Sequence, residues 1–137
     1  MEQRNDLILR EIEKLSLFLQ KLIKDISGTN TNEIESRINQ INEALITEFD
    51  LSIDAIIKFE NNELLSKISD LHESNIENLA ELLHEIVKKL YQENTAYGFD
   101  RKELARKAIV LIEYIDENSD TFSMDRMHLK DALKKLL

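Results

Sequence analysis

Proline is absent from all 137 residues of the chain, and glycine occurs only at Gly28 and Gly98. Proline ends helices and interrupts strands, while glycine supplies the left-handed backbone that most tight hairpin turns require. The scarcity of both excludes a sheet protein with many tight turns and predicts a series of helices. It also argues against glycine-rich phosphate loops and the glycine-flanked serine of hydrolases, because both motifs need glycine at fixed positions.

The composition predicts one helical domain over residues 1–137, since a chain of this length buries roughly two-thirds of its unfolded surface. Apolar residues make up 42% and aromatic residues 6%, so the core must consist mainly of Leu and Ile. Cysteine is absent, which excludes disulfides, thiolate zinc sites and cysteine nucleophiles. We find no apolar run near the 18 or so residues of a membrane span and no signal-peptide pattern, and therefore expect a cytoplasmic protein.

The net charge of −9 is concentrated in the middle of the chain. Residues 28–87 hold thirteen acidic and three basic side chains, a local net charge of −10. This segment repels nucleic-acid phosphates and anionic lipids, so we expect a protein partner, a basic one, and neither nucleic acid nor membrane. The alternative is that the charge serves only solubility.

Apolar spacing predicts five long helices with one or two short ones between them. The long helices are expected at about 7–27, 33–48, 75–93, 101–118 and 123–137. Expected helix starts and stops are Asn5 or Asp6, Gly28, Asn32, the break at Asn61–Asn62, Ser74, Asp100 and Ser123. In the last helix, Phe122 and Met127 have the spacing of a hydrophobic staple, and Met127, Leu133, Leu136 and Leu137 are expected to face inward.

The first helix carries the clearest candidate for a binding surface. Its apolar residues recur at alternating steps of four and three, a heptad-like seam held for nearly three repeats. The seam consists of Ile8, Ile12, Leu15, Leu19, Leu22 and Ile26. One interpretation is an ordinary buried helix. The other is pairing with another chain, either a partner's helix or a second copy in a homodimer.

Candidate chemistry is limited to one histidine element. Glu81 and His84 stand one helical turn apart, the Glu-x-x-His spacing of di-iron helical bundles. A metal-dependent helical-bundle enzyme would have to combine them with Glu77 and His128. Because this spacing arises easily by chance in an acidic helical chain, we expect no metal, no cofactor and no catalytic residues. His72 and its neighbour Glu73 point about 100° apart on a helix, so they do not form an acid–base pair.

A basic cluster lies at the start of the fourth long helix, just after two aromatic residues. The cluster is Arg101, Lys102, Arg106 and Lys107, preceded by Tyr97 and Phe99. It is the best nucleic-acid patch in the sequence, although nearby acidic residues dilute it. We instead expect these bases to contact the acidic segment 28–87, within the molecule or between subunits.

Residues 75–137 form a helix-turn-helix-turn-helix pattern with Ala105 and Ala108 placed for close helix contact and Tyr91 late in the preceding helix. This part resembles the tetratricopeptide-type helical hairpin. The whole chain also resembles small bacterial helical proteins of unknown function, in which a first helix of the type Ile8-Leu9-Arg10-Glu11-Ile12-Glu13-Lys14-Leu15 precedes tetratricopeptide-like helices. The resemblance implies a helical scaffold and carries over no active site.

The sequence therefore predicts an all-α fold, either a single-domain irregular helical bundle or a short tetratricopeptide-like stack of antiparallel helical hairpins. The expected function is a non-catalytic protein–protein interaction or scaffold module. The first alternative is an acidic inhibitor of the immunity-protein type that binds a basic partner. The second is the metal-dependent helical-bundle enzyme.

Overall fold

A computed structural model describes residues 2–92 and 100–137 of the chain. These residues form seven α-helices and one short 3₁₀ helix and contain no strand, which confirms the all-α fold and the pattern of five long and two short helices. The elements are α1 (Glu2–Ser27), the 3₁₀ helix (Thr31–Glu33), α2 (Ile34–Phe49), α3 (Ile53–Lys58), α4 (Asn61–Ile68), α5 (Glu73–Gln92), α6 (Arg101–Asn118) and α7 (Met124–Lys134). The break expected between the helices at 75–93 and 101–118, with Tyr97, Gly98 and Phe99, lies outside the described residues.

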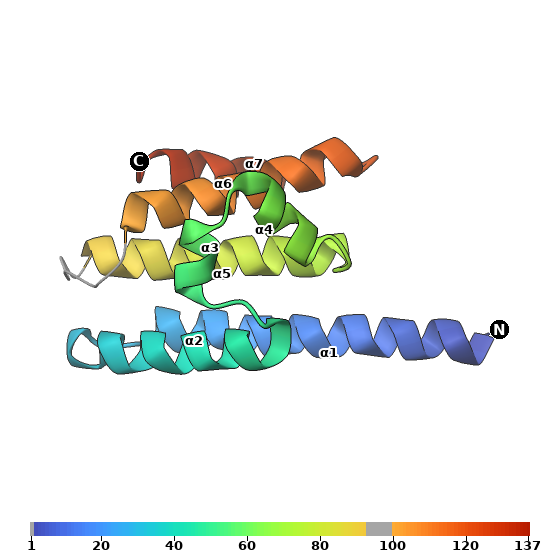
Figure 1. The fold of residues 1–137 in the computed structure, drawn as a ribbon, viewed down its shortest axis with the longest axis horizontal. Helices are drawn as coiled ribbons and strands as arrows, with labels where there is room; N and C mark the ends of the chain where they lie inside the picture. Colours follow the sequence, from blue (N-terminus) through green and yellow to red (C-terminus); the bar gives the residue numbers. More distant parts are fainter. Residues whose placement is uncertain (1, 93–99) are drawn as a thin grey trace.

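The helix α5 lies between α1 on one side and α6 on the other (Figure 1). The helix α2 packs along α1, and α7 packs against α6 and α5. The two short helices α3 and α4 cross from the end of α2 to the surface of α6 (Figure 1). Apolar side chains from all seven helices meet in one core.

The central place of α5 follows from its sequence. Nine of its residues are buried, more than one helical face can hold, so the helix must be covered on two sides. They are Asn75, Ile76, Leu79, Ala80, Leu82, Leu83, Ile86, Val87 and Leu90. The face of α2 likewise follows from helical spacing: Ile34, Ile38, Ile41 and Leu45 are buried, and Phe49 at its end is half-buried.

A buried lysine holds the α3–α4 turn against α6. Lys107 is only 5% exposed, and its ammonium donates hydrogen bonds to the carbonyl of Phe59 and to Oδ1 of Asn61, 3.1 Å away. Its nearest carboxylate, on Glu103 of the same helix, lies 3.8 Å from Nζ. Lys107 thus reaches the acidic segment as expected, but it bonds there to neutral oxygen atoms rather than to carboxylates.

The other bases of this cluster are engaged elsewhere. Arg106 pairs with Glu103 on its own helix at 2.9 Å. The guanidinium of Arg101 lies 4.3 Å from the centre of the Tyr91 ring and donates to the carbonyl of Leu90. No ion pair with an acid of segment 28–87 is formed by Arg101 or Arg106 in the described part of the chain.

A buried arginine joins three helices. Arg126 of α7 donates to Oδ1 of Asp116 in α6 at 2.7 Å, to the Thr121 carbonyl at 2.7 Å and to Oε1 of Glu77 in α5 at 3.5 Å. The hydrogen bond that the guanidinium donates to Asp116, together with the charges of the Asp116 and Glu77 carboxylates, raises the pKa of Arg126 above its ordinary value. A buried guanidinium needs such partners, because an unpaired one would lose its hydration without compensation.

Two of the expected helix caps are confirmed. The carboxylate of Asp100 accepts hydrogen bonds from the backbone N–H groups of Lys102 and Glu103. The hydroxyl of Ser123 accepts one from the backbone N–H of Arg126. These caps are predictable because the capping side chain and the backbone N–H groups from which it accepts lie within three residues of each other.

The other predicted helix starts are corrected. The helix α1 begins at Glu2, so Asn5 and Asp6 lie inside it, and α2 begins without a side-chain bond from Asn32. Asn61 opens α4 instead of breaking a helix, because Glu60 and Glu63 form a capping box there. The start of α5 is held not by Ser74 but by His72, whose Nδ1 accepts from the Ser74 backbone N–H.

The predicted hydrophobic staple of α7 is wrong. Phe122, its expected partner before the cap, is 76% exposed, and Met127 and Leu137, expected to face inward, are exposed as well. Leu133 is buried and Leu136 is half-buried. The helix α7 lies at the edge of the fold, where a single neighbouring layer leaves one side in water.

In residues 2–92 and 100–137, the left-handed backbone position lies at an aspartate. Gly28 follows α1 as expected, but its φ is not positive. Asp50, after α2, has φ 53° and ψ 42°, and its N–H bonds to the carbonyl of Ile46. Asp tolerates this conformation better than most residues, although it is strained relative to glycine.

We expect Asp50→Gly to match or exceed the wild-type stability and Asp50→Val to lower it by roughly 1–2 kcal/mol, because a β-branched residue resists positive φ. Urea denaturation measures both. Gly28→Ala is the control at the other helix end: the added methyl would meet only the Lys24 carbonyl, at 3.4 Å, so no loss is expected. Equal stability of Asp50→Gly and Asp50→Val would show that residue 50 does not adopt a left-handed backbone conformation.

We expect Lys107→Ala to lower the free energy of unfolding by roughly 1–3 kcal/mol, because it leaves the Phe59 carbonyl and the Asn61 amide without their donor. Lys102→Ala, an exposed lysine on the same helix, is the matched control and should change stability by less than about 0.5 kcal/mol. Equal effects of the two substitutions in urea denaturation would show that Lys107 does not anchor the turn.

Candidate functional site

The helix α1 is much longer than the helix that covers it. It has 26 residues and α2 has 16, a difference of ten residues or about 15 Å of helix. The ring of Phe49, at the end of α2, packs on the ring of Phe18 in the middle of α1, with centroids 6.3 Å apart. The N-terminal part of α1 therefore extends beyond α2 (Figure 1).

This overhang divides the candidate seam into two halves. Leu19, Leu22 and Ile26 lie in the core, under α2 and α5. Toward the N-terminus the burial decreases: Ile12 and Leu15 are half-buried, and Ile8 is 52% exposed. Only the N-terminal half of the seam is thus available to a partner.

The start of α5 forms the opposite wall of this region and is pinned to α1. The side-chain amide of Asn75 donates to the carbonyl of Ile12 at 3.2 Å, and that of Asn78 donates to Oγ of Ser16 at 3.1 Å. These two bonds hold the α4–α5 connection beside the middle of α1. They also fix the distance between the two walls.

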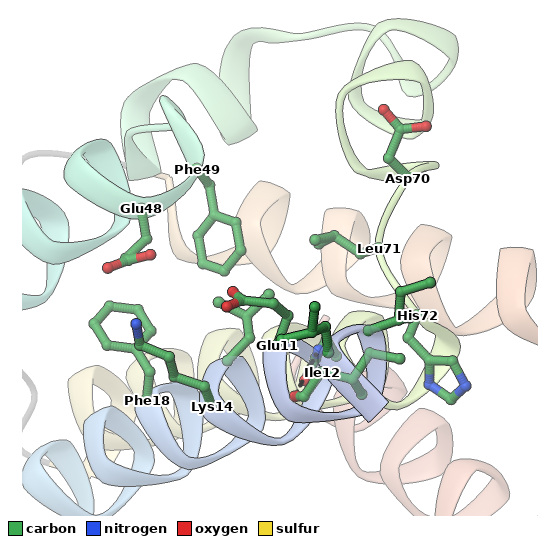
Figure 2. Close-up of a pocket in the computed structure, with 13 residues that line it drawn as sticks. Glu11, Ile12, Lys14, Phe18, Glu48, Phe49, Asp70, Leu71 and His72 are labelled. Atoms are coloured by element: carbon green, nitrogen blue, oxygen red, sulfur yellow. Dashed lines mark hydrogen bonds between the residues drawn. The ribbon is translucent and has the colours of Figure 1, made fainter. Parts of the chain in front are cut away.

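Between these elements lies a groove of about 580 Å³, which we call the α1 groove. Figure 2 shows Phe18 and Ile12 of α1 on one side of it and Phe49 and Leu71 across from them. Its apolar lining consists of Leu7, Ile8, Ile12, Leu15, Phe18, Phe49 and Leu71. Its polar lining consists of Glu11, Lys14, Glu48, Asp70, His72 and Asn75.

The rim of the α1 groove is acidic and unpaired. Glu11, Glu48 and Asp70 come from α1, α2 and the α4–α5 connection, and Lys14 is the one basic residue among the lining residues. None of these four side chains forms an ion pair with another described side chain, in residues 5–92 and 100–137. The carboxylates are therefore free to meet a cation from outside.

One buried atom in the groove lining lacks a partner. Asn75 is 1% exposed, and its Oδ1 accepts no hydrogen bond in the part of the chain that the structure describes. A buried acceptor without a donor costs free energy, roughly 1–3 kcal/mol. This position therefore works against stability unless something else supplies a donor.

The arrangement suits binding of apolar side chains. Ile8, Ile12 and Leu15 follow one another along about 10 Å of helix, the spacing with which a helix presents anchors to a groove. The titratable ring in the lining, His72, is used to cap α5 through Nδ1. Among the described lining residues we find no nucleophile held by a base.

The Glu-x-x-His element lies on the other side of α5. His84 and His128 share a second, shallower groove of about 530 Å³ with Lys88, Asp131 and Lys135. Burial is the main cause that lowers the pKa of His84, and the Lys88 ammonium adds to the effect.

The carboxylates that a metal site would need are arranged differently. Glu77 is engaged by Arg126. Burial and the neighbouring carboxylates, first Glu85 and then Glu77, raise the pKa of Glu81. Within the described ranges, no three His, Asp or Glu side chains come together in a way that could hold a metal ion.

Several residues of the α1 groove were not singled out by sequence reasoning. Leu71 and Asn75 join the site only through the packing of α5 on α1. The available signals were an apolar residue between the polar Asp70 and His72, and an asparagine next to the apolar face of α5. Both are visible in the sequence, but neither says which helix they meet.

Comparison of the chain with protein-family models, with curated proteins and with solved structures finds no match. Among the helices that the structure describes, none combines the length and the apolar character needed to cross a bilayer.

We expect the stability of the wild type to fall between about pH 7.5 and about pH 5.5, and part of this loss to disappear in His84→Gln. The native-state pKa of His84 is lowered by burial, so the unfolded chain binds more protons as the pH drops through its ordinary value, and unfolding is favoured there. Urea denaturation at several pH values measures the free energy of unfolding. The control is His128→Gln, which replaces an exposed histidine. Identical pH profiles for His84→Gln and the wild type would show that His84 is not the cause of the loss.

Proposed function

We propose that this chain is a non-catalytic protein-interaction module of the cytoplasm, and that its α1 groove receives a helix from a partner protein. The observation that carries the proposal is the unpaired N-terminal half of the α1 seam. Leu7 and Ile8 are more than half exposed there, at the point where α2 has already ended.

The seam itself supports a helical occupant. Along its C-terminal half, α2 covers α1 with Ile38, Ile41 and Leu45. The same apolar spacing continues into the overhang, so a helix placed in line with α2 would cover Ile8 and Ile12 in the same manner. Burial of this surface contributes roughly 25 cal/mol of favourable free energy per Å² of apolar area, and this drives the association.

The size of the groove supports a short contact. The partly exposed row from Ile8 to Leu15 corresponds to roughly two turns of a docked helix, with anchors at i, i+3 or i+4, and i+7. An interface of this kind buries less than about 1,200 Å², the range of transient complexes. We therefore expect reversible binding rather than a permanent assembly.

The test uses a designed amphipathic helix of about 18 residues with Leu at the anchor positions and Gln on its other faces. We expect this peptide to bind the wild-type protein in fluorescence anisotropy, and Ile8→Glu to weaken binding at least about tenfold, because it places a charge in the apolar contact. Circular dichroism checks that the variant is folded. This is expected, because Ile8 is exposed.

Leu17→Glu is the matched control. Leu17 lies on the same helix and is 67% exposed, but it does not line the α1 groove. It should bind the peptide as the wild type does, and a scrambled peptide of the same composition should bind neither. The proposal fails if the amphipathic peptide binds no better than the scrambled one, or if Leu17→Glu and Ile8→Glu lose binding equally.

A further inference from the structure

We infer that the partner segment in the α1 groove is an amphipathic helix with basic residues beside its apolar face, and not a second copy of this chain. The inference rests on the proposed function and adds the chemistry of the partner. It is carried by the charges of the groove rim and by the unpaired amide oxygen in its lining.

The rim carboxylates differ from those that stabilise the fold. Asp116 and Glu103 each pair with a base of the same chain, as do Glu77 and Glu85. Glu11, Glu48 and Asp70 pair with no base whose side chain the structure describes, although they come from three separate elements that the fold brings to one opening. Charges gathered in this way around an apolar contact select a partner of opposite sign and speed its approach.

The charge of the rim disfavours a second copy. In a two-fold symmetric dimer the same surface faces itself, so each rim would bring its acids against those of the other copy. Lys14 supplies one positive charge against Glu11, Glu48 and Asp70. Like charges facing each other across an apolar contact are unfavourable, whereas a basic helix neutralises all three acids.

The amide of Asn75 points to the same chemistry. Its Oδ1 is a buried acceptor without a donor. Lysine and arginine side chains carry only donors, three on an ammonium and five on a guanidinium. A basic helix therefore offers cations to the rim carboxylates and N–H donors to the groove that Asn75 lines.

The test compares three designed helices that share the Leu anchors and differ only in the flanking residues, which are Lys, Gln or Glu. We expect the Lys-flanked peptide to bind most tightly and the Glu-flanked peptide least tightly. In a variant with Glu11→Gln, Glu48→Gln and Asp70→Asn, the Lys-flanked peptide should bind roughly 3- to 30-fold more weakly, since exposed ion pairs contribute modestly and add up over three sites. Added salt should weaken the wild-type complex in the same direction.

A second triple variant controls for net charge. Glu113→Gln, Glu117→Gln and Asp120→Asn remove the same number of acids from exposed positions that do not line the α1 groove. This variant should bind the Lys-flanked peptide within about twofold of the wild type, a change below 0.5 kcal/mol. Equal weakening of both triple variants would mean that overall charge, not the rim, attracts the peptide, and would overturn the inference.

The remaining outcomes separate this inference from the proposed function. If all three peptides bind equally and Ile8→Glu still abolishes binding, the groove binds helices without charge selection: the proposed function stands and this inference falls. If none of the peptides binds, both fall. Sedimentation equilibrium tests the other occupant: we expect a monomer, and a dimer that Ile8→Glu dissociates would show that the groove is filled by a second copy.

Discussion

The burial of α5 from two sides is the constraint on which the rest of the fold depends. Its apolar residues surround too much of the helix for one neighbour to cover, so α1 and α6 must both pack on it. The remaining helices attach to these two: α2 lies along α1, α3 and α4 are tied to α6 through Lys107, and α7 is tied to α6 and α5 through Arg126. Polar bonds of Lys107 and Arg126 place α3, α4 and α7, while α2 and the central three helices are held mainly by apolar burial.

The α1 groove is a direct result of this arrangement. Contact with α5 holds α1, and Asn75 and Asn78 fix their meeting point near residues 12–16. The cover from α2 ends at Phe49, because Asp50 adopts a left-handed conformation and turns the chain away toward α6. A long helix held at its middle and covered at one end leaves its other end open. The opening therefore comes from a difference in length rather than from a specialised loop.

Local patterns in the sequence predict much of this fold but not the site. The apolar faces of α2 and α5 follow from helical spacing, and the caps at Asp100 and Ser123 follow from contacts within three residues. The seam of α1 does not predict that Ile8 is exposed while Leu19 is buried, because both residues belong to the same heptad-like apolar spacing. That difference depends on where α2 ends and where α5 crosses, which are contacts between distant segments. The same reason explains why Phe122, with the spacing of a staple, lies in water.

The three-way bonding of Arg126 has a consequence for the order in which the molecule comes apart. The helix α7 buries only Leu133 completely among its apolar residues, so its attachment relies on the bonds of Arg126 to Asp116, Glu77 and the Thr121 carbonyl. Loss of these few bonds frees the helix, whereas separation of α1, α5 and α6 requires exposure of the apolar core. Local unfolding therefore begins at the C-terminal helix, which does not line the α1 groove.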